Sequence, residues 1–394
     1  NINNKLGDIL VIYNVKSGDS LYSIARKFVV PSQYIVSING LTQINNLVIG
    51  MSLVIPVKSI YDSLLPKTSI ETLGYYNPPS YKDAISLVDN MGQSFTYLGI
   101  YYYNVLASGE IVEGLESNTL KIGLTRDITI IPVLINMIQG GFSSDLARTI
   151  LATLETTNNF INNILKFIQK YNLKGINIDF ENLYPEDRNL YTRFIRLLSQ
   201  RLHIYNKILI VNLAPKWDDW PERPWAGFFD YNAIGPYIDI AAIMTYEWGW
   251  SAGPPRPTAP INYVKRALDY AIANSIPANK IMMGMTLYGY DWTLPTTANS
   301  EATTVSIEQV WNLARIHNAS IHFNQETKQP YMMYIDYNNQ NHIIWFEDAL
   351  SHYYKYQVVK DYHLRGAFYW TINIPFQSTW YILSSLFKVI KLIK

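Results

Sequence analysis

The feature that most constrains the fold is the alternation of short apolar runs with amphipathic segments between residues 70 and 394. Apolar runs flanked by helical patterns are typical of parallel strands, because helices bury both faces of a parallel sheet. Helical spacing follows most of the eight apolar runs, which lie at 72–77, 95–106, 128–137, 175–180, 207–213, 238–246, 281–288 and 366–371. Such units over about 325 residues predict an α/β fold, the TIM (β/α)8 barrel.

The alternative α/β arrangement is an open, doubly wound sheet. Nucleotide-binding sheets of that kind carry a glycine-rich phosphate turn after an early strand, and no such turn is present here. The barrel is therefore the preferred prediction. Its helices are expected at 81–91, 144–171 (one long helix or a pair), 185–204, 263–274 and 380–392.

The alternation is interrupted after the seventh predicted strand. Residues 291–344 contain one helical pattern, at 307–317, and two short strand-like runs, at 331–337 and 342–345. We therefore expect a small α+β insertion in the barrel at this point.

The first 57 residues have a different pattern. A strand at 10–15 is followed by Ser20, whose side chain can cap a helix, then by a second helix after Pro31 and a closing strand at 53–55. This order predicts a small βααβ unit, because two helices on a two-stranded sheet can bury one core. The expected limits are 1–57 for this unit, 58–69 for a linker or docking segment, and 70–394 for the barrel.

The charge balance and the residue content exclude several classes of function. With 32 basic and 31 acidic residues, the chain lacks the basic field that is typical of nucleic-acid binding. Without cysteine, it forms neither a disulfide nor a cysteine-ligated metal site. Its six histidines are scattered, and no apolar run reaches the ~20 residues of a membrane helix. We expect no cofactor, metal, nucleic-acid partner or membrane span, and a signal peptide is not visible in a chain that begins with Asn1.

The most informative stretch is 174–182, around the fourth predicted strand. Because strand side chains alternate, Asn177, Asp179 and Glu181 share one face, which must point into the barrel. Two neighbouring carboxyl groups resist ionising together, so one tends to stay protonated. This arrangement suits a general acid at Glu181 that is supported by Asp179. A hydrogen-bonded polar plug inside the barrel is the alternative interpretation.

The same stretch resembles the signature of glycoside hydrolase family 18, Asp-Gly-x-Asp-x-Asp-x-Glu. Gly175, Asp179 and Glu181 match the signature, whereas Lys174 and Asn177 stand where the first two aspartates are usual. Lys174 lies at the start of the strand and should matter little. Asn177 alters the proton relay but can still hydrogen-bond Asp179, and it is similar to the asparagine of the spore-cortex peptidoglycan hydrolases in this family.

Three further segments resemble the motifs on the sixth, seventh and eighth strands of the family: 242–247, 284–290 and 366–370. The resemblance implies that Tyr246 hydrogen-bonds the substrate acetamido group, with Glu247 in place of the usual aspartate. It further implies that Tyr288 contacts the substrate and that Trp370 forms the floor of the sugar site. Many members of the family also carry an insertion at the place of 291–344.

The resemblance implies a substrate-assisted, retaining mechanism. Glu181 protonates the leaving glycosidic oxygen, and the N-acetyl oxygen of the substrate attacks the anomeric carbon. Asp179 and Tyr246 orient the acetamido group, and Glu181 then acts as the base for the incoming water. The scheme requires a 2-acetamido sugar on the non-leaving side.

Aromatic residues make up 14% of the chain, with 31 Tyr and 10 Trp. Trp217 and Trp248 closely follow predicted strand ends, where barrel active sites are built, so we expect both in the cleft. Tyr75, near the end of the first predicted strand, is a further candidate for substrate binding. Packing in the core is the alternative for each of these three residues.

The 1–57 unit resembles the LysM domain, a module that binds N-acetylglucosamine-containing glycans. The resemblance places the glycan along Gly18, Asp19 and Ser20 and along the loop after the second helix. A single copy implies weak binding that raises the local concentration of enzyme on a polymer. The matching residues are Tyr13, Val15, Gly18, Asp19, Ser20, Leu21, Ile24, Ala25, Phe28, Ile35, Asn39, Leu41, Gly50, Leu53, Ile55 and Pro56.

Together, these patterns predict a monomeric N-acetylglucosaminidase that cleaves bacterial peptidoglycan, in the spore cortex during germination. The LysM-like unit is expected to anchor the enzyme to the wall, outside the cytoplasm. The first alternative is a chitinase with the same chemistry. The second is an inactive glycan-binding protein, which the presence of Glu181 disfavours. The patterns leave open exo or endo cleavage and the recognition of muramic-acid derivatives.

Overall fold

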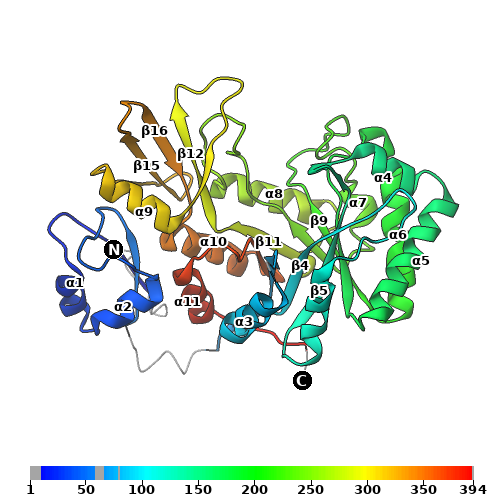
Figure 1. Cartoon of the computed structure of the whole chain (residues 1–394), viewed down its shortest axis with the longest axis horizontal. Helices are drawn as coiled ribbons and strands as arrows, with labels where there is room; N and C mark the ends of the chain where they lie inside the picture. The colour runs from blue at the N-terminus through cyan, green and yellow to red at the C-terminus, as the bar shows by residue number, and fades with distance from the viewer. Residues whose placement is uncertain (1–9, 58–65, 79, 393–394) are drawn as a thin grey trace.

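The structure is a computed structural model that describes residues 10–57, 66–78 and 80–392. Its centre is a closed barrel in which each strand pairs in parallel with the next along the chain and the last pairs with the first. This topology confirms the predicted TIM barrel (Figure 1). The barrel strands are β3 (Thr68–Tyr76), β4 (Tyr97–Asn104), β5 (Thr129–Ile135), β8 (Gly175–Asp179), β9 (Ile208–Leu213), β10 (Ile240–Ile243), β11 (Ile281–Thr286) and β17 (Gly366–Trp370).

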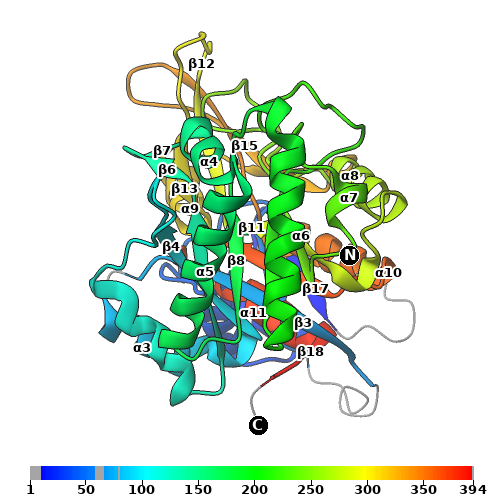
Figure 2. The same ribbon diagram turned by 90° about the vertical axis from the view of Figure 1, so that its right-hand side faces the viewer.

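Apolar side chains from alternate strand positions fill the barrel interior, and a ring of helices buries the other face of each strand. Figure 2 shows α4, α5 and α6 lying across one side of the sheet. The interior residues include Leu73, Tyr97, Ile131, Val133, Ile210, Ile240, Met282 and Phe368. The helices of the barrel domain are α3 (Tyr81–Met91), α4 (Ser144–Leu151), α5 (Leu154–Lys170), α6 (Arg188–Ile204), α7 (Tyr231–Ile234), α8 (Ile261–Ala273), α10 (Ala349–Asp361) and α11 (Gln377–Leu386).

One predicted helix ends earlier in the structure, and one helix of the structure was not predicted. The helix expected at 380–392 is wrong after Leu386, because Phe387–Val389 forms strand β18 and pairs in parallel with the start of β3. Helix α10 was not predicted at all. Its buried residues include Ser351, His352 and Lys355, so it has no separate apolar stripe for a sequence pattern to reveal.

The insertion after β11 is a five-stranded antiparallel sheet with one helix, which confirms the expected α+β character. Its strand order is β13-β12-β16-β15-β14. Three of its strands escaped the sequence analysis, because two have only four residues and the third follows β11 directly. The elements are β12 (Tyr288–Leu294), β13 (Thr303–Ser306), α9 (Ile307–Ile316), β14 (Ile321–Asn324), β15 (Gln329–Ile335) and β16 (Asn341–Trp345).

The N-terminal unit has the expected βααβ order, with its two strands antiparallel. Ser20 caps its first helix, where the side-chain oxygen accepts a hydrogen bond from the Ser23 N–H at 3.1 Å. Most of the predicted linker, residues 58–65, and the first nine residues lie outside the described part of the chain. The elements are β1 (Val11–Asn14), α1 (Leu21–Phe28), α2 (Ser32–Asn39) and β2 (Ser52–Ile55).

The remaining elements are short. A small hairpin follows β5, and 3-10 turns occur at several connections. No helix in the described ranges is long and apolar enough to cross a membrane. The short elements are β6 (Met137–Ile138), β7 (Gly141–Phe142), η1 (Gly92–Ser94), η2 (Leu115–Leu124), η3 (Pro185–Asp187) and η4 (Ala278–Lys280).

Candidate active site

Strand β8 carries the polar stretch that the sequence singles out. Asn177 and Asp179 are 0% and 3% exposed, and Glu181 lies half-buried just beyond the carboxyl end of the strand. Gly175 begins the strand, and a Cβ there would lie 2.3 Å from the Ile208 carbonyl oxygen of β9. Only glycine allows the two strands to approach so closely, so this position of the signature is set by packing.

The interior of the barrel mouth holds a hydrogen-bonded group of Tyr75, Asn177 and Asn212. The Tyr75 hydroxyl lies 2.7 Å from Asn177 Oδ1 and 2.6 Å from Asn212 Oδ1, and Asn177 Nδ2 donates to Asn212 Oδ1 at 3.0 Å. Asn177 therefore does not make the expected hydrogen bond to Asp179 in the described structure, because its amide is already engaged. Asn212 is the neighbouring side chain whose hydrogen bonding lowers the pKa of Asp179.

Sequence reasoning missed Asn212, although a signal was present. It is a polar residue within the apolar strand β9, and its side chain enters the polar group inside the barrel. Asp179 Oδ1 has no hydrogen-bond partner among the described residues, so one oxygen of a buried carboxyl group stays unsatisfied. An unsatisfied buried acceptor is costly to the fold, which favours a functional interpretation over a polar plug.

Burial sets the protonation of the two carboxyl groups. It raises the pKa of Asp179 to about 7, against the opposing effect of the hydrogen bond from Asn212. Burial also raises the pKa of Glu181 well above its ordinary value, and the charges of Asp179 and Glu247 raise it further. Both effects favour the protonated form of Glu181, which is the form that a general acid requires.

Asn136 holds the backbone at Glu181. Its Oδ1 accepts a hydrogen bond from the Glu181 N–H at 2.9 Å, and its Nδ2 donates to the Glu181 carbonyl oxygen at 3.0 Å. Asn136 is 0% exposed and directly follows β5. The sequence analysis did not identify it, and its position at the end of an apolar run was the available signal.

Tyr246 and Glu247 follow strand β10. Burial raises the pKa of Tyr246 well above its ordinary value, and the neighbouring Tyr75 and Glu247 raise it further. The Tyr246 hydroxyl therefore remains a hydrogen-bond donor. Glu247 Oε1 accepts hydrogen bonds from the hydroxyls of Tyr288 at 2.7 Å and Tyr290 at 2.9 Å. The glutamate thus joins the barrel mouth to the first strand of the insertion. Tyr290 is a third residue that the sequence analysis did not identify as part of the site.

Trp370 lies at the end of β17, next to the residues of the first two strands. Its ring centre is 5.8 Å from that of Tyr75 and 4.7 Å from that of Tyr101, with edge-to-face geometry. Tyr75 is 1% exposed and its hydroxyl belongs to the polar group inside the barrel, and its contact with substrate stays a prediction. Trp217 and Trp248 are half-buried and stack on each other at 6.3 Å, beyond β9 and β10.

The LysM residues that we predict to bind glycan lie together in one turn of the N-terminal unit. Gly18 has φ +84°, and Asp19 Oδ2 accepts hydrogen bonds from the Tyr13 hydroxyl and the Lys16 N–H, both at 2.8 Å. Together with the Ser20 cap, these contacts fix the shape of the loop, and the side chains are not brought to the barrel mouth.

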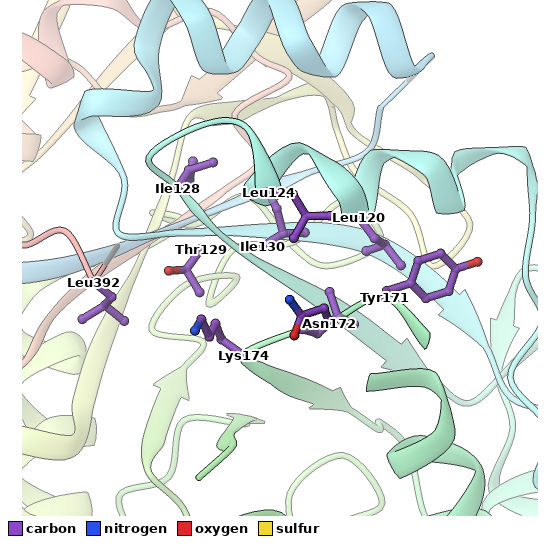
Figure 3. Close-up of a pocket in the computed structure, with 11 residues that line it drawn as sticks. Leu120, Leu124, Ile128, Thr129, Ile130, Tyr171, Asn172, Lys174 and Leu392 are labelled. Atoms are coloured by element: carbon purple, nitrogen blue, oxygen red, sulfur yellow. The ribbon is translucent and has the colours of Figure 1, made fainter. Parts of the chain in front are cut away.

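A pocket of about 380 Å³ lies at the opposite, amino-terminal end of the barrel strands (Figure 3). It is lined mainly by apolar side chains, and Lys174 stands at its edge, before β8 begins. Lys174 is thus at the far end of β8 from Asp179. No cluster of three or more His, Asp or Glu side chains in the described part of the chain is arranged to hold a metal ion.

The barrel and the carboxyl groups at its mouth define a class of protein, and comparison with known proteins agrees. Residues 74–374 match the model of glycosyl hydrolases family 18, and residues 13–56 match the LysM domain. The chain belongs to glycosyl hydrolase family 18, is therefore a glycosidase, and carries one LysM domain.

Particular relatives match over almost the whole chain. The chain is 35% identical to the cortical fragment-lytic enzyme of Bacillus subtilis, over 96% of this chain and 99% of that protein. It is 32% identical to the spore cortex-lytic enzyme SleL of Bacillus cereus, whose crystal structure aligns with a TM-score of 0.89 over 98% of this chain and 99% of that one. A Chromobacterium violaceum chitinase is 25% identical, with a TM-score of 0.73 over 80% of this chain and 98% of that one.

Proposed function

We propose that this glycosidase cleaves N-acetylglucosamine linkages in bacterial peptidoglycan, and that its substrate is the cortex of spores during germination. The observation that carries the proposal is the pair of Asp179 and Glu181 at the mouth of a family 18 barrel, where burial and neighbouring charges raise the pKa of Glu181. The names of the relatives that match both domains, cortical fragment-lytic enzyme and spore cortex-lytic enzyme, support the choice of cortex as the substrate. We further propose that the protein acts as a monomer, outside the cytoplasm, at the wall.

The proposed chemistry divides between Glu181 and the substrate. Glu181 donates its proton to the glycosidic oxygen as that bond breaks, while the acetamido oxygen of the substrate bonds to the anomeric carbon. Asp179 and Tyr246 hold the acetamido group, and Asn177 supports them through Asn212. Glu181 then takes a proton from the water that opens the cyclic intermediate, and the anomeric configuration is retained.

The decisive experiment replaces Glu181 with glutamine and measures turnover of cortex fragments and of chitin oligomers. Loss of the general acid should lower kcat by about 10²–10⁴-fold while substrate binding persists. Glu326→Gln, a change at an exposed carboxylate in the insertion, is the matched control and should leave kcat unchanged. Undiminished turnover by Glu181→Gln contradicts the proposed role of Glu181.

The same assay separates two alternative functions. Cleavage of chitin oligomers without cleavage of cortex fragments favours a chitinase, a possibility supported by the likeness to the Chromobacterium violaceum chitinase. Binding of both glycans by the wild-type protein without turnover of either favours a glycan-binding protein.

We propose that the LysM domain binds the wall glycan through the Gly18–Asp19–Ser20 turn and the loop after α2. Ile44 in that loop is 45% exposed, and replacing it with aspartate should weaken binding to insoluble wall while leaving hydrolysis of short soluble glycans unchanged. Ile204→Asp, at an exposed isoleucine at the end of α6, is the control. Equal wall binding by the Ile44→Asp variant and the wild type contradicts this assignment of the loop.

A further inference from the structure

Aromatic and basic side chains gather beyond strands β9 and β10, at the end of the barrel that carries Glu181. Trp217 packs against Trp220 at 4.6 Å, Tyr263 at 5.6 Å and Trp248 at 6.3 Å between ring centres. Trp248 directly follows Glu247, so the cluster begins one residue from the site described above. We call this cluster, with three neighbouring arginines, the aromatic–arginine rim: Trp217, Trp220, Trp248, Tyr263, Arg223, Arg256 and Arg266.

Two of these arginines are held against indole rings. The Arg223 guanidinium carbon lies 4.1 Å from the ring centre of Trp220, and that of Arg266 lies 5.4 Å from the ring centre of Trp217. Tyr263 and Arg266 are one turn apart on α8 and both contact Trp217, so the helix positions the two side chains together. Stacking on an aromatic face leaves the guanidinium N–H groups directed outward.

Arg256 lies in the loop beside Trp248. The loop is fixed by hydrogen bonds from the Trp248 N–H to the Thr258 carbonyl oxygen and from the Gly249 N–H to the Pro257 carbonyl oxygen, both at 3.0 Å. The third arginine of the rim is therefore on an ordered segment next to Glu247.

Within the described residues, the rim arginines lack the ion-pair partners that several other arginines of the barrel have. Arg148, Arg188 and Arg365 each form ion pairs with carboxylates. In the described residues, Arg223, Arg256 and Arg266 are exposed and form no ion pair. Asp218 and Glu222 are also exposed, in the segment that carries Trp217 and Arg223. Their negative charges offset part of the positive charge of the rim, so selection of a carboxylate must depend on guanidinium geometry rather than on net charge.

We propose that the aromatic–arginine rim recognises a carboxylate on the glycan and so selects peptidoglycan over chitin. This inference rests on the proposed function. Chitin carries no carboxylate, whereas peptidoglycan offers the 3-O-lactyl acid of muramic acid where no peptide is attached, and the carboxylates of the peptide stem where one is. A guanidinium binds a carboxylate through paired N–H···O bonds, and the neighbouring rings cover an apolar sugar face.

The test uses the full chain with Arg223→Gln, Arg266→Gln, Arg256→Gln and the combined variant. Four soluble substrates separate the sources of charge: alternating N-acetylglucosamine–N-acetylmuramic acid oligomers without peptide, the same oligomers with peptide stems, the lactyl methyl esters of the peptide-free oligomers, and chitin oligomers. Arg196→Gln, at an exposed and unpaired arginine on the outer helix α6, is the control.

Each rim substitution should raise KM for a carboxylate-bearing substrate by about tenfold, with kcat unchanged, because one charge-assisted hydrogen bond is lost. KM for the methyl esters and for chitin oligomers should not change. An increase for the peptide-free acid assigns the lactyl carboxylate, and an increase only with peptide stems assigns the stem carboxylates. Raising the ionic strength from about 0.05 M to about 0.5 M should reproduce the loss in the wild type.

Equal KM changes for charged and neutral substrates, or no change for any substrate, overturns the inference while leaving the proposed cleavage intact. Failure of the wild type to cleave any of the four substrates overturns the proposed function instead.

Discussion

At the residue scale, Asp179 is held at a cost to stability, which fits the role in substrate binding that we propose for it. Asp179 is almost completely buried, one of its oxygens has no hydrogen-bond partner in the described part of the chain, and burial raises its pKa to about 7. Its charged form is therefore disfavoured in the folded protein compared with the unfolded chain. Sites of this kind are expected where a fold holds a group for chemistry rather than for stability.

Asp179→Asn should stabilise the protein above neutral pH. The folded-state pKa of Asp179 is raised above its unfolded value, so its favourable contribution is present below about pH 4 and is lost as the pH rises through about 7. An asparagine does not ionise, so the variant should gain on the order of 2 kcal/mol at pH 8 and little at pH 3. Denaturant unfolding at the two pH values measures the difference, and an equal change at both contradicts the buried carboxyl as its source.

Glu247→Gln should shift the alkaline limb of the pH–rate profile to lower pH. The negative charge of Glu247 helps to raise the pKa of Glu181, so its removal lets Glu181 lose its proton at lower pH. The glutamine oxygen can still accept from Tyr288 and Tyr290, which preserves the local geometry. The profile of kcat/KM on a soluble oligomer reports the shift, and an alkaline limb that moves upward contradicts the electrostatic coupling.

At the scale of the elements, β8 combines close packing at its start with the buried carboxyl group for which we propose a chemical role. Its first residue, Gly175, allows close contact with β9. Asn177 and Asp179, further along the strand, are buried and face the barrel interior. Asp179 faces the barrel interior only if the register of β8 against β9 is fixed. That register pairs Gly175 with Ile208.

Gly175→Ala should therefore destabilise the whole barrel. A Cβ placed 2.3 Å from a backbone oxygen must push the two strands apart, which should cost about 2–4 kcal/mol of unfolding free energy. Gly141→Ala is the matched control, since its Cβ would meet only one atom, at 4.0 Å. Equal midpoints in denaturant for both variants and the wild type would show that β8 and β9 can move apart at no cost.

At the scale of the whole molecule, the LysM domain is packed against the barrel domain (Figure 1). All four residues of β2 are buried, with α10 and α11 covering the strand. Thr42 Oγ1 donates to Glu308 Oε1 at 2.8 Å, and the Ile321 N–H donates to the Ile49 carbonyl oxygen at 2.9 Å. The loop that precedes β2 is thus joined to the insertion.

Deletion of residues 1–57 should consequently lower the melting temperature of the remaining chain. Removing the domain exposes the faces of α10, α11 and α9 that it covers, and a loss of at least about 5 °C is expected. Thermal unfolding of the full and shortened chains makes the comparison. An unchanged melting temperature would mean that the two domains are energetically independent.

The sequence by itself determined the barrel, the LysM-like unit and the face that carries Asp179 and Glu181. These follow from local rules, because hydrophobic periodicity sets the strands and alternation sets their faces. The same rules placed Tyr246 and Trp370 near strand ends, where parallel strands bring distant residues together. Their individual roles remain predictions.

Only the tertiary structure decided which side chains meet. Asn212 lies on β9 next to Asp179, and Asn136, just after β5, accepts a hydrogen bond from the Glu181 N–H. No local sequence pattern specifies such contacts. Helix α10 was hidden because neighbouring elements bury its polar side as well as its apolar side. Strand β18 formed where a helix was expected because the start of β3 offered it a partner. Each of these outcomes depends on what packs across space, and a one-dimensional pattern does not contain that information.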